Sequence, residues 1–81
     1  MPPDLPAGFT PYPNPDSGVA AYRIGRDHID VAFREGGIYR YSVLSAGRTN
    51  LDEMARLARA GAGLATFISR VTYHLYEQRL E

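Results

Sequence analysis

Residues 28–43 read HIDVAFREGGIYRYSV, and the predicted architecture is built around them. Apolar and polar side chains alternate on both sides of the glycine pair Gly36-Gly37. Successive side chains of a strand point to opposite faces of a sheet, so this alternation indicates two half-buried strands. We expect a β-hairpin formed by His28–Arg34 and Ile38–Val43. Its apolar face consists of Ile29, Val31, Phe33, Tyr39, Tyr41 and Val43.

The hairpin loop follows from the requirement that paired residues point to the same face of the sheet. A two-residue loop at Gly36-Gly37 would pair Phe33 with Arg40 and place a charge on the apolar face. A three-residue loop, Glu35-Gly36-Gly37, keeps that face apolar and supplies a glycine for the left-handed position. The predicted pairs are therefore Phe33 with Tyr39, Val31 with Tyr41, and Ile29 with Val43.

An earlier strand, Val19–Ile24, is expected to complete a three-stranded antiparallel meander. The same rule makes Arg26-Asp27 a two-residue connection between this strand and the next. The predicted pairs are Ile24 with Ile29, Tyr22 with Val31, and Arg23 with Asp30.

Helical periodicity replaces strand alternation after residue 50. Asn50 is expected to cap the first helix, with Glu53 as its reciprocal capping partner. The apolar stripe of this helix is Leu51, Met54, Ala55 and Ala58. Residues 61–63, Gly-Ala-Gly, should end it.

A second helix is expected from about Leu64 to Arg79. Its stripe is Leu64, Phe67, Ile68, Val71 and Leu75. Two helices can cover only one face of so small a sheet. The predicted fold class is therefore α+β, a three-stranded antiparallel meander followed by two helices packed on one face (βββαα), over residues 19–81.

Residues 1–18 form a proline-rich N-terminal arm, because all six prolines lie within the first fifteen positions. Proline fixes φ and removes a backbone donor, so we expect extended or irregular structure there. Pro3 and Pro6 form a minimal P-x-x-P spacing. Phe9 and Tyr12 are the only anchors, and we expect order from about Ala7 onward.

Composition bounds the class of protein. Nine arginines balance nine acidic residues in 81 residues, and there is no lysine, cysteine or tryptophan. Zero net charge excludes a generally basic nucleic-acid coat, although it leaves room for one basic face. The lack of cysteine excludes disulfides and cysteine-ligated metals. No apolar run reaches ~20 residues and no signal peptide is visible, so we expect one cytoplasmic domain without a membrane partner.

The stretch from Tyr22 to Tyr73 resembles the KTSC domain, named for the C-terminus of some lysyl-tRNA synthetases and also found as a single-domain bacterial protein. The resemblance covers about 50 of the 81 residues. The matching motifs are Ile29-Asp30-Val31-Ala32-Phe33, Gly36-Gly37, Tyr39-Arg40-Tyr41, the small residues Ala58 to Gly63, Phe67-Ile68 and Arg70. The asparagine that the family often has near Phe67 or Ile68 is missing. Attachment to a tRNA synthetase implies RNA binding for the family by association.

The polar face of the meander is the first candidate binding surface, for RNA or another phosphate-bearing ligand. It carries Arg23, His28, Arg34 and Arg40. Arg23 should pair with Asp30 across the strands, which leaves Arg34 and Arg40 uncompensated. Two such guanidinium groups can hold a phosphate, while the simpler interpretation is an ordinary solvated face.

The Tyr39-Arg40-Tyr41 motif has two interpretations. Aromatic rings on a sheet can stack bases, but the predicted register places both tyrosines in the core. His28 and His74 have no third ligand or orienting acid at a suitable spacing, so we expect no metal, no cofactor and no catalytic residues.

A second candidate surface would serve a protein partner or a second copy of the chain. Its residues are Tyr73, Tyr76, Phe9 and Tyr12. Ser69, Tyr73, Tyr76 and Leu80 would form one line on the second helix, which binds either a homo-oligomer partner or the arm. The leading hypothesis is a non-catalytic module that binds RNA or phosphate. The alternative is a protein-interaction or regulatory module, of phage or mobile-element origin, that acts through the arm or the tyrosine line.

Overall fold

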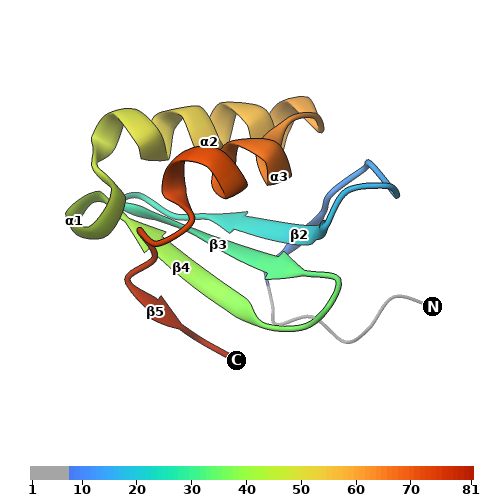
Figure 1. The fold of residues 1–81 in the computed structure, drawn as a ribbon, viewed down its shortest axis with the longest axis horizontal. Helices are drawn as coiled ribbons and strands as arrows, with labels where there is room; N and C mark the ends of the chain where they lie inside the picture. Colours follow the sequence, from blue (N-terminus) through green and yellow to red (C-terminus); the bar gives the residue numbers. More distant parts are fainter. Residues whose placement is uncertain (1–7) are drawn as a thin grey trace.

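The computed structural model of the protein describes residues 8–81 and shows an antiparallel sheet with helices on one face (Figure 1). The predicted α+β class is confirmed at this level. The strands are β1 (Thr10–Pro11), β2 (Val19–Ile24), β3 (His28–Phe33), β4 (Ile38–Ser42) and β5 (Gln78–Arg79). The helices are α1 (Val43–Ala46), α2 (Arg48–Ala60), α3 (Leu64–Phe67) and the π-helical turn η1 (Ile68–Thr72).

The sheet has five strands in the order β1-β2-β3-β4-β5, so the predicted three-stranded sheet is corrected. β2, β3 and β4 lie where the alternation predicts them, and two-residue strands flank them. Tyr12 N donates to the carbonyl of Ala20 at 2.9 Å, and Leu80 N donates to the carbonyl of Ile38 at 2.6 Å. Two residues are too few to show an alternating pattern, and Pro11 is tolerated because β1 is an edge strand.

The register of β2 with β3 agrees with the prediction. Tyr22 pairs with Val31, Arg23 with Asp30, and Ile24 with Ile29. The register shifts between Val19 and Ala21, where β2 contains a bulge. The bulge turns Val19 toward the helices while Ala21 faces away from them, because an extra residue changes the face of the side chains beyond it.

The predicted register of β3 with β4 is wrong by two residues. Val31 pairs with Tyr39, Ile29 with Tyr41, and Asp30 with Arg40. The loop has three residues as expected, but Phe33 N donates to Gly37 O at 3.1 Å, so the loop is residues 34–36. Gly36, at φ +114°, takes the position that favours glycine. A shift of two residues keeps every side chain on its predicted face, so the alternation could not exclude it.

The first helical segment differs from the prediction at its start. Val43 leaves the sheet and begins α1, whose first turn is capped by Ser42 and Ser45 in a reciprocal capping box. α2 begins at Arg48, so Asn50 lies inside the helix and its amide donates to Ala46 O at 2.9 Å. The prediction of Asn50 as the cap is therefore wrong, because Gly47 separates two helices where the sequence suggests one loop. The helix ends at Gly61 in the left-handed conformation, as expected.

The second helix is shorter than predicted. It runs through α3 and η1 to Thr72, and the chain then turns to add β5 to the edge of β4. The backbone of Glu77 donates to Arg40 O at 2.6 Å, a bond that only an existing β4 edge can offer. Tyr73 and Tyr76 are therefore not on one helical line with Leu80, which packs on the opposite face of the sheet.

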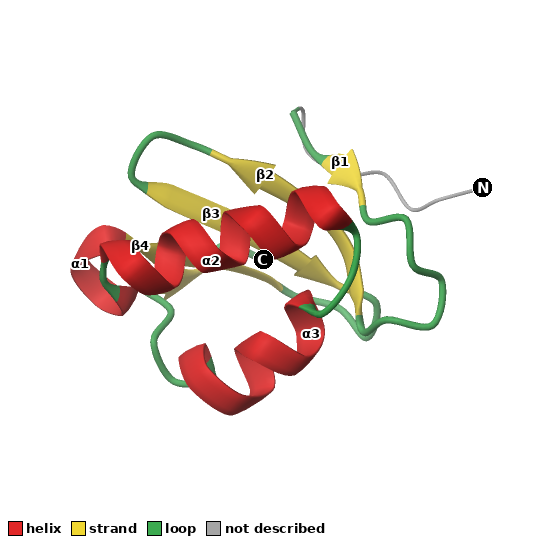
Figure 2. Cartoon of the chain, turned by 90° about the horizontal axis from the view of Figure 1, so that it is seen from above, coloured by secondary structure: helices red, strands yellow, loops and turns green. Residues whose placement is uncertain are grey.

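The helices α2 and α3 lie over one face of the sheet (Figure 2), and the core lies between these two layers. Its buried residues are Tyr12, Val19, Ile29, Val31, Tyr41, Leu51, Met54, Ala58, Leu64 and Ile68. A smaller apolar cluster covers the other face of the sheet, where Phe9 and Leu80 pack against Ala21, Ala32 and Ile38. Both faces of the sheet thus bury apolar side chains, which the predicted arrangement of one covered face did not include.

The described part of the N-terminal arm is built into this sheet. Tyr12 is 4% exposed, its ring meets Tyr22 edge to face, and its hydroxyl accepts a hydrogen bond from Leu64 N at 3.3 Å. Phe9 lies on the opposite face under Arg23. The expectation that both rings dock near Tyr73 and Tyr76 or on a second copy is therefore wrong. The P-x-x-P spacing and the predicted start of order at Ala7 lie outside the described residues.

Candidate functional site

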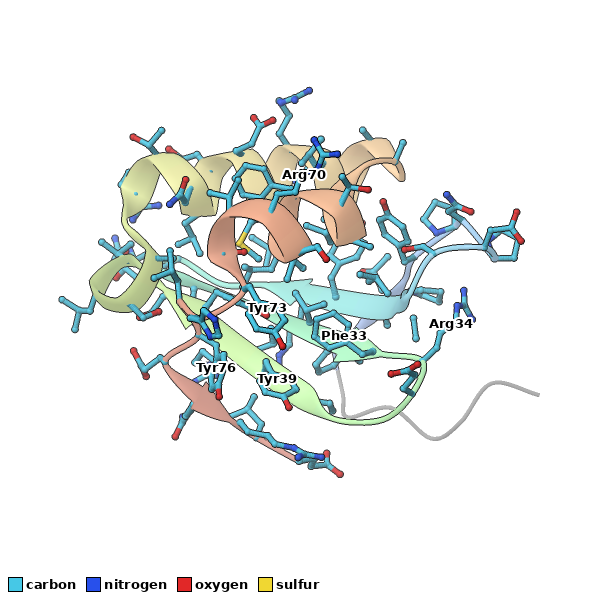
Figure 3. All side chains as sticks on the ribbon, in the orientation of Figure 1. Phe33, Arg34, Tyr39, Arg70, Tyr73 and Tyr76 are labelled. Carbon is cyan, nitrogen blue, oxygen red and sulfur yellow. The ribbon has the colours of Figure 1, made fainter. Side chains whose placement is uncertain are left out.

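A groove of about 700 Å³ opens between the β3–β4 hairpin and the segment from α3 to Tyr76. Six of the side chains that line it are aromatic or heteroaromatic, namely Phe33, Tyr39, Tyr41, Tyr73, His74 and Tyr76. Figure 3 shows Phe33, Tyr39, Tyr73 and Tyr76 gathered on this side of the sheet. Tyr73, His74 and Tyr76 line the groove from the segment where the chain has left helical geometry after Thr72 and turns toward β5.

The rings of the groove meet edge to face. The centroids of Tyr39 and Tyr76 are 4.8 Å apart at an interplanar angle of 74°. Phe33 and Tyr39 are 5.7 Å apart at 75°, and Tyr41 and Tyr76 are 6.4 Å apart at 83°. Such perpendicular pairs are favourable because a positive ring edge meets a negative ring face. Because the rings of each pair are nearly perpendicular, they do not form one flat platform.

The groove runs from buried rings to exposed ones. Tyr41 is 2% exposed, while Tyr76 is 42% and Tyr73 61% exposed. Tyr39 is half-buried, so the expectation that both tyrosines of the Tyr39-Arg40-Tyr41 motif lie in the core holds fully only for Tyr41. Burial, together with the neighbouring Tyr39 and Tyr76, raises the pKa of Tyr41 to about 12. Its phenol is therefore uncharged at neutral pH.

Charge is sparse in the groove. Glu35 and His74 are the ionisable groups of its lining besides the tyrosines. Within residues 8–81, no hydrogen bond or ion pair of the Glu35 carboxylate is found. Arg79 lies beside the groove with its guanidinium 5.5 Å from the centroid of Tyr39, and its Nε donates to Glu81 O at 2.9 Å.

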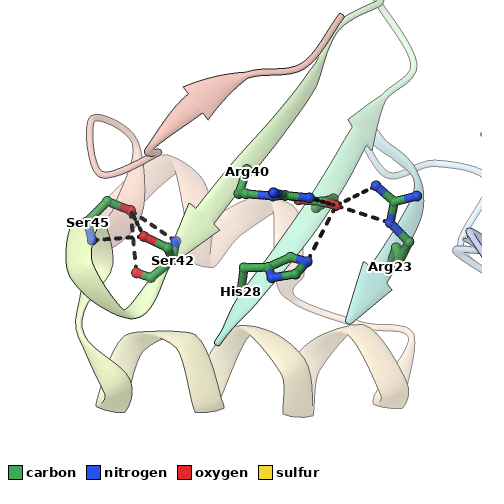
Figure 4. A network of polar contacts seen from close by, with 6 residues as sticks. Arg23, His28, Arg40, Ser42 and Ser45 are labelled. Atoms are coloured by element: carbon green, nitrogen blue, oxygen red, sulfur yellow. Dashed lines mark hydrogen bonds and ion pairs between the residues drawn. The ribbon is translucent and has the colours of Figure 1, made fainter. Parts of the chain in front are cut away.

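The candidate phosphate face has a different electrostatic character from the one predicted. Asp30 is fully buried between two arginines (Figure 4). Arg40 Nε donates to Asp30 Oδ1 at 2.8 Å, and Arg23 Nη2 donates to Asp30 Oδ2 at 2.8 Å. His28 Nε2 lies 3.8 Å from the same carboxylate. Arg23 pairs with Asp30 as expected, but Arg40 is also compensated, so that part of the prediction is wrong.

The Asp30 carboxylate is held in its charged form. Burial is the largest influence and would raise the pKa of Asp30, but the hydrogen bonds from Arg40 and Arg23 together outweigh it and lower the pKa. The carboxylate thus neutralises much of the positive charge of its neighbours. A phosphate ligand at this place would have to compete with a buried anion that is already bound at short distance.

The guanidinium group of Arg34 is bound to backbone carbonyl groups and is not part of a free basic surface. Its Nε donates to Ser17 O at 2.8 Å and its Nη2 to Asn14 O at 3.2 Å. The guanidinium group therefore ties the hairpin loop to the segment before β2. The structure does not combine Arg34 and Arg40 into one pair of free cations, although the alternation correctly places Arg23, His28 and Arg40 together.

A smaller hollow of about 400 Å³ adjoins this network. It is lined by Asp27, His28, Arg40, Ser42, Val43, Leu44 and Glu77. Leu44 is 94% exposed there. Among residues 8–81, no group of three histidine, cysteine or acidic side chains has the arrangement of a metal site.

Sequence reasoning found part of the groove. Tyr73 and Tyr76 were candidates for an interaction surface and both line it, whereas Phe9 and Tyr12 do not. Phe33 and Glu35 were missed as site residues, while Tyr39 was weighed as a stacking ring and His74 as a ligand, and both were set aside. The face parity assigned Phe33 and Tyr39 to the core, whereas both are half-buried and line the groove.

Comparisons with known proteins add no assignment. None of the helices in residues 8–81 combines the length and the apolar character that crossing a membrane requires. The sequence matches no model of a protein family, no curated protein and no solved structure.

Proposed function

We propose that the protein is a non-catalytic binding module that takes a segment of a partner protein into the aromatic groove. The observation that carries this proposal is a groove of about 700 Å³ lined by six aromatic or heteroaromatic side chains, with Tyr73 and Tyr76 substantially exposed. Tyrosine is enriched at protein interfaces because it buries a large apolar ring and retains a polar hydroxyl. The groove therefore favours the protein-interaction hypothesis over the RNA hypothesis.

The RNA and phosphate hypothesis stays a prediction with weaker support. Its named residues Arg23 and Arg40 share the buried Asp30, and Arg34 is bonded to backbone carbonyls. The KTSC resemblance and the βββαα layout that the residue patterns predict remain proposals as well. A KTSC-like core with two added edge strands is compatible with the order of the central elements, since β2, β3 and β4 precede α2 and α3.

A displayed library of random peptides tests the proposal. We expect selection on the wild-type protein to enrich peptides whose binding is lost on Tyr73→Ser. Leu44→Ser is the matched control, because Leu44 is also apolar and highly exposed but lies outside the groove. Enriched peptides that bind Tyr73→Ser as well as the wild type, or no enrichment, would contradict the proposal.

A random RNA pool selected in parallel tests the alternative. RNA that binds at low salt, weakens steeply with added salt and is sensitive to Arg40→Gln would support the arginine face as the functional surface. In that case Tyr73→Ser should leave RNA binding unchanged.

A further inference from the structure

Resting on the proposed function, we propose that the groove binds a proline-rich segment in the polyproline II conformation, with a basic side chain next to Glu35. The proposal names the conformation and charge of the ligand. It depends on ring geometry, on polarity and on the charge of the groove lining, each of which is independent of the others.

Ring geometry limits the stacking of a flat ligand on Tyr39. The ring centroids of Tyr39 and Tyr76 are 4.8 Å apart at an angle of 74°, and the guanidinium of Arg79 lies over the Tyr39 ring, 5.5 Å from its centroid. A nucleobase that stacks on this face of Tyr39 would have to displace the guanidinium of Arg79. Proline-rich segments in the polyproline II conformation dock into aromatic-lined grooves of other proteins, where the pyrrolidine rings pack against aromatic side chains.

Polarity agrees with this ligand. A polyproline II segment has no internal hydrogen bonds, so its carbonyl groups need external donors. Tyrosine hydroxyls supply donors beside apolar rings. Tyr73 and Tyr76, which are 61% and 42% exposed, are the tyrosines of the groove lining that a ligand can reach most easily. A segment rich in proline also loses little conformational entropy on binding, since its backbone is already extended.

Charge selects the flanking residue of the ligand. Glu35 lines the groove, and within residues 8–81 its carboxylate has no hydrogen bond or ion pair. The guanidinium of Arg79 is engaged with Tyr39 and Glu81. A ligand with an arginine or lysine at the Glu35 end is therefore favoured, and a phosphodiester backbone is disfavoured.

The same charge argument disfavours the proline-rich arm of a second copy of this chain as the ligand. Residues 1–18 contain six prolines, but their charged side chains are Asp4 and Asp16, and no arginine precedes Arg23. This segment lacks the cation that Glu35 would pair with. Binding of the chain's own arm remains an outcome that the experiment distinguishes.

Fluorescence anisotropy with the full chain tests the ligand class. The probe is the labelled peptide RPPLPPLP, and the comparisons are the same peptide with alanine for proline, the same peptide with glutamate for arginine, and a uridine octamer. We expect the proline peptide to bind best.

Among the protein variants, Tyr73→Ser should weaken the binding of the proline peptide by about tenfold. Glu35→Gln should weaken it by about two- to fivefold, with no effect on a variant peptide that lacks the arginine. Asp52→Asn on the exposed face of α2 is the matched control and should change nothing.

The outcomes separate this inference from the function on which it rests. An alanine peptide that binds equally well and keeps its dependence on Tyr73 overturns the polyproline ligand and leaves the peptide-binding function intact. If the proline peptide does not bind at concentrations up to about 1 mM but the display selection enriches other peptides, the polyproline ligand is again overturned and the peptide-binding function stays intact. If only the uridine octamer binds, both proposals fail. If the full chain self-associates and deletion of residues 1–7 abolishes this, the chain's own arm is the ligand.

Discussion

Arg40 and Asp30 face each other across β4 and β3 and are joined by two hydrogen bonds of 2.8 and 3.1 Å. The carboxylate is fully buried, whereas the Arg40 side chain is 27% exposed. Arg23 binds the same carboxylate from β2, so one aspartate joins the three central strands on the face away from the helices. This arrangement makes the candidate phosphate face a stabilising feature of the sheet.

Asp30→Asn should destabilise the protein by about 3 kcal/mol, because it removes the shared partner of two partly buried arginines and leaves like charges side by side. Urea unfolding monitored by circular dichroism measures the change. Asp52→Asn is the matched control, since its carboxylate is 66% exposed and pairs with Arg48 at 3.4 Å. The control should shift stability by less than about 1 kcal/mol. If both variants lose the same amount of unfolding free energy, the buried network contributes no more to stability than an exposed ion pair.

The pH dependence of stability should reflect the ionisation of the Asp30 carboxylate. The pKa of Asp30 in the folded protein lies below its usual value of 3.8. The unfolded chain therefore binds the proton more tightly, so the charged carboxylate stabilises the fold above about pH 4 and this contribution is lost as the pH falls through the lower folded pKa. Unfolding free energies of the wild type should fall between about pH 5 and pH 2 more than those of Asp30→Asn. If the unfolding free energies of the two proteins depend on pH in the same way, Asp30 is not the source of the acid sensitivity.

Tyr12 should be essential to the core although it belongs to the proline-rich arm. Tyr12→Phe removes the acceptor for Leu64 N and should cost about 1 kcal/mol. Tyr12→Ser also removes a buried ring and should cost about 3–5 kcal/mol. Thermal unfolding measures both. Val71→Ser serves as the control, because Val71 is 44% exposed and should tolerate the change. A Tyr12→Ser protein that melts like the wild type would mean that the arm does not complete the core.

Thr72 at the end of η1 offers a stabilising substitution. Its side chain is fully buried, and its hydroxyl has no hydrogen-bond partner among residues 8–81. Thr72→Val keeps the shape and removes the unpaired polar group, so it should raise the free energy of unfolding by about 1 kcal/mol. Thr72→Ser keeps the hydroxyl and loses a methyl group, so it should lower stability by about 1 kcal/mol. A destabilising Thr72→Val would indicate that the hydroxyl is satisfied in solution.

Local patterns in the sequence were enough for several features. The alternation in residues 19–43 identified β2, β3 and β4 and the face of each side chain, because strand side chains have a period of two. The turn at Arg26-Asp27 set the register of β2 with β3. The stripe Leu51, Met54 and Ala58 identified the buried face of α2. Each of these depends on neighbours in the chain.

The β3–β4 register, the two edge strands and the groove depend on the assembled sheet. Period two leaves a shift of two residues invisible, and both Gly36 and Gly37 could serve the loop, so packing chose the pairing of Asp30 with Arg40. β1 and β5 form because the edges of β2 and β4 present backbone groups that need partners. That edge, with the rings of Tyr39 and Tyr41 that receive Tyr76, also ends the last helix early. The groove depends on that ending, so no local pattern could have predicted it.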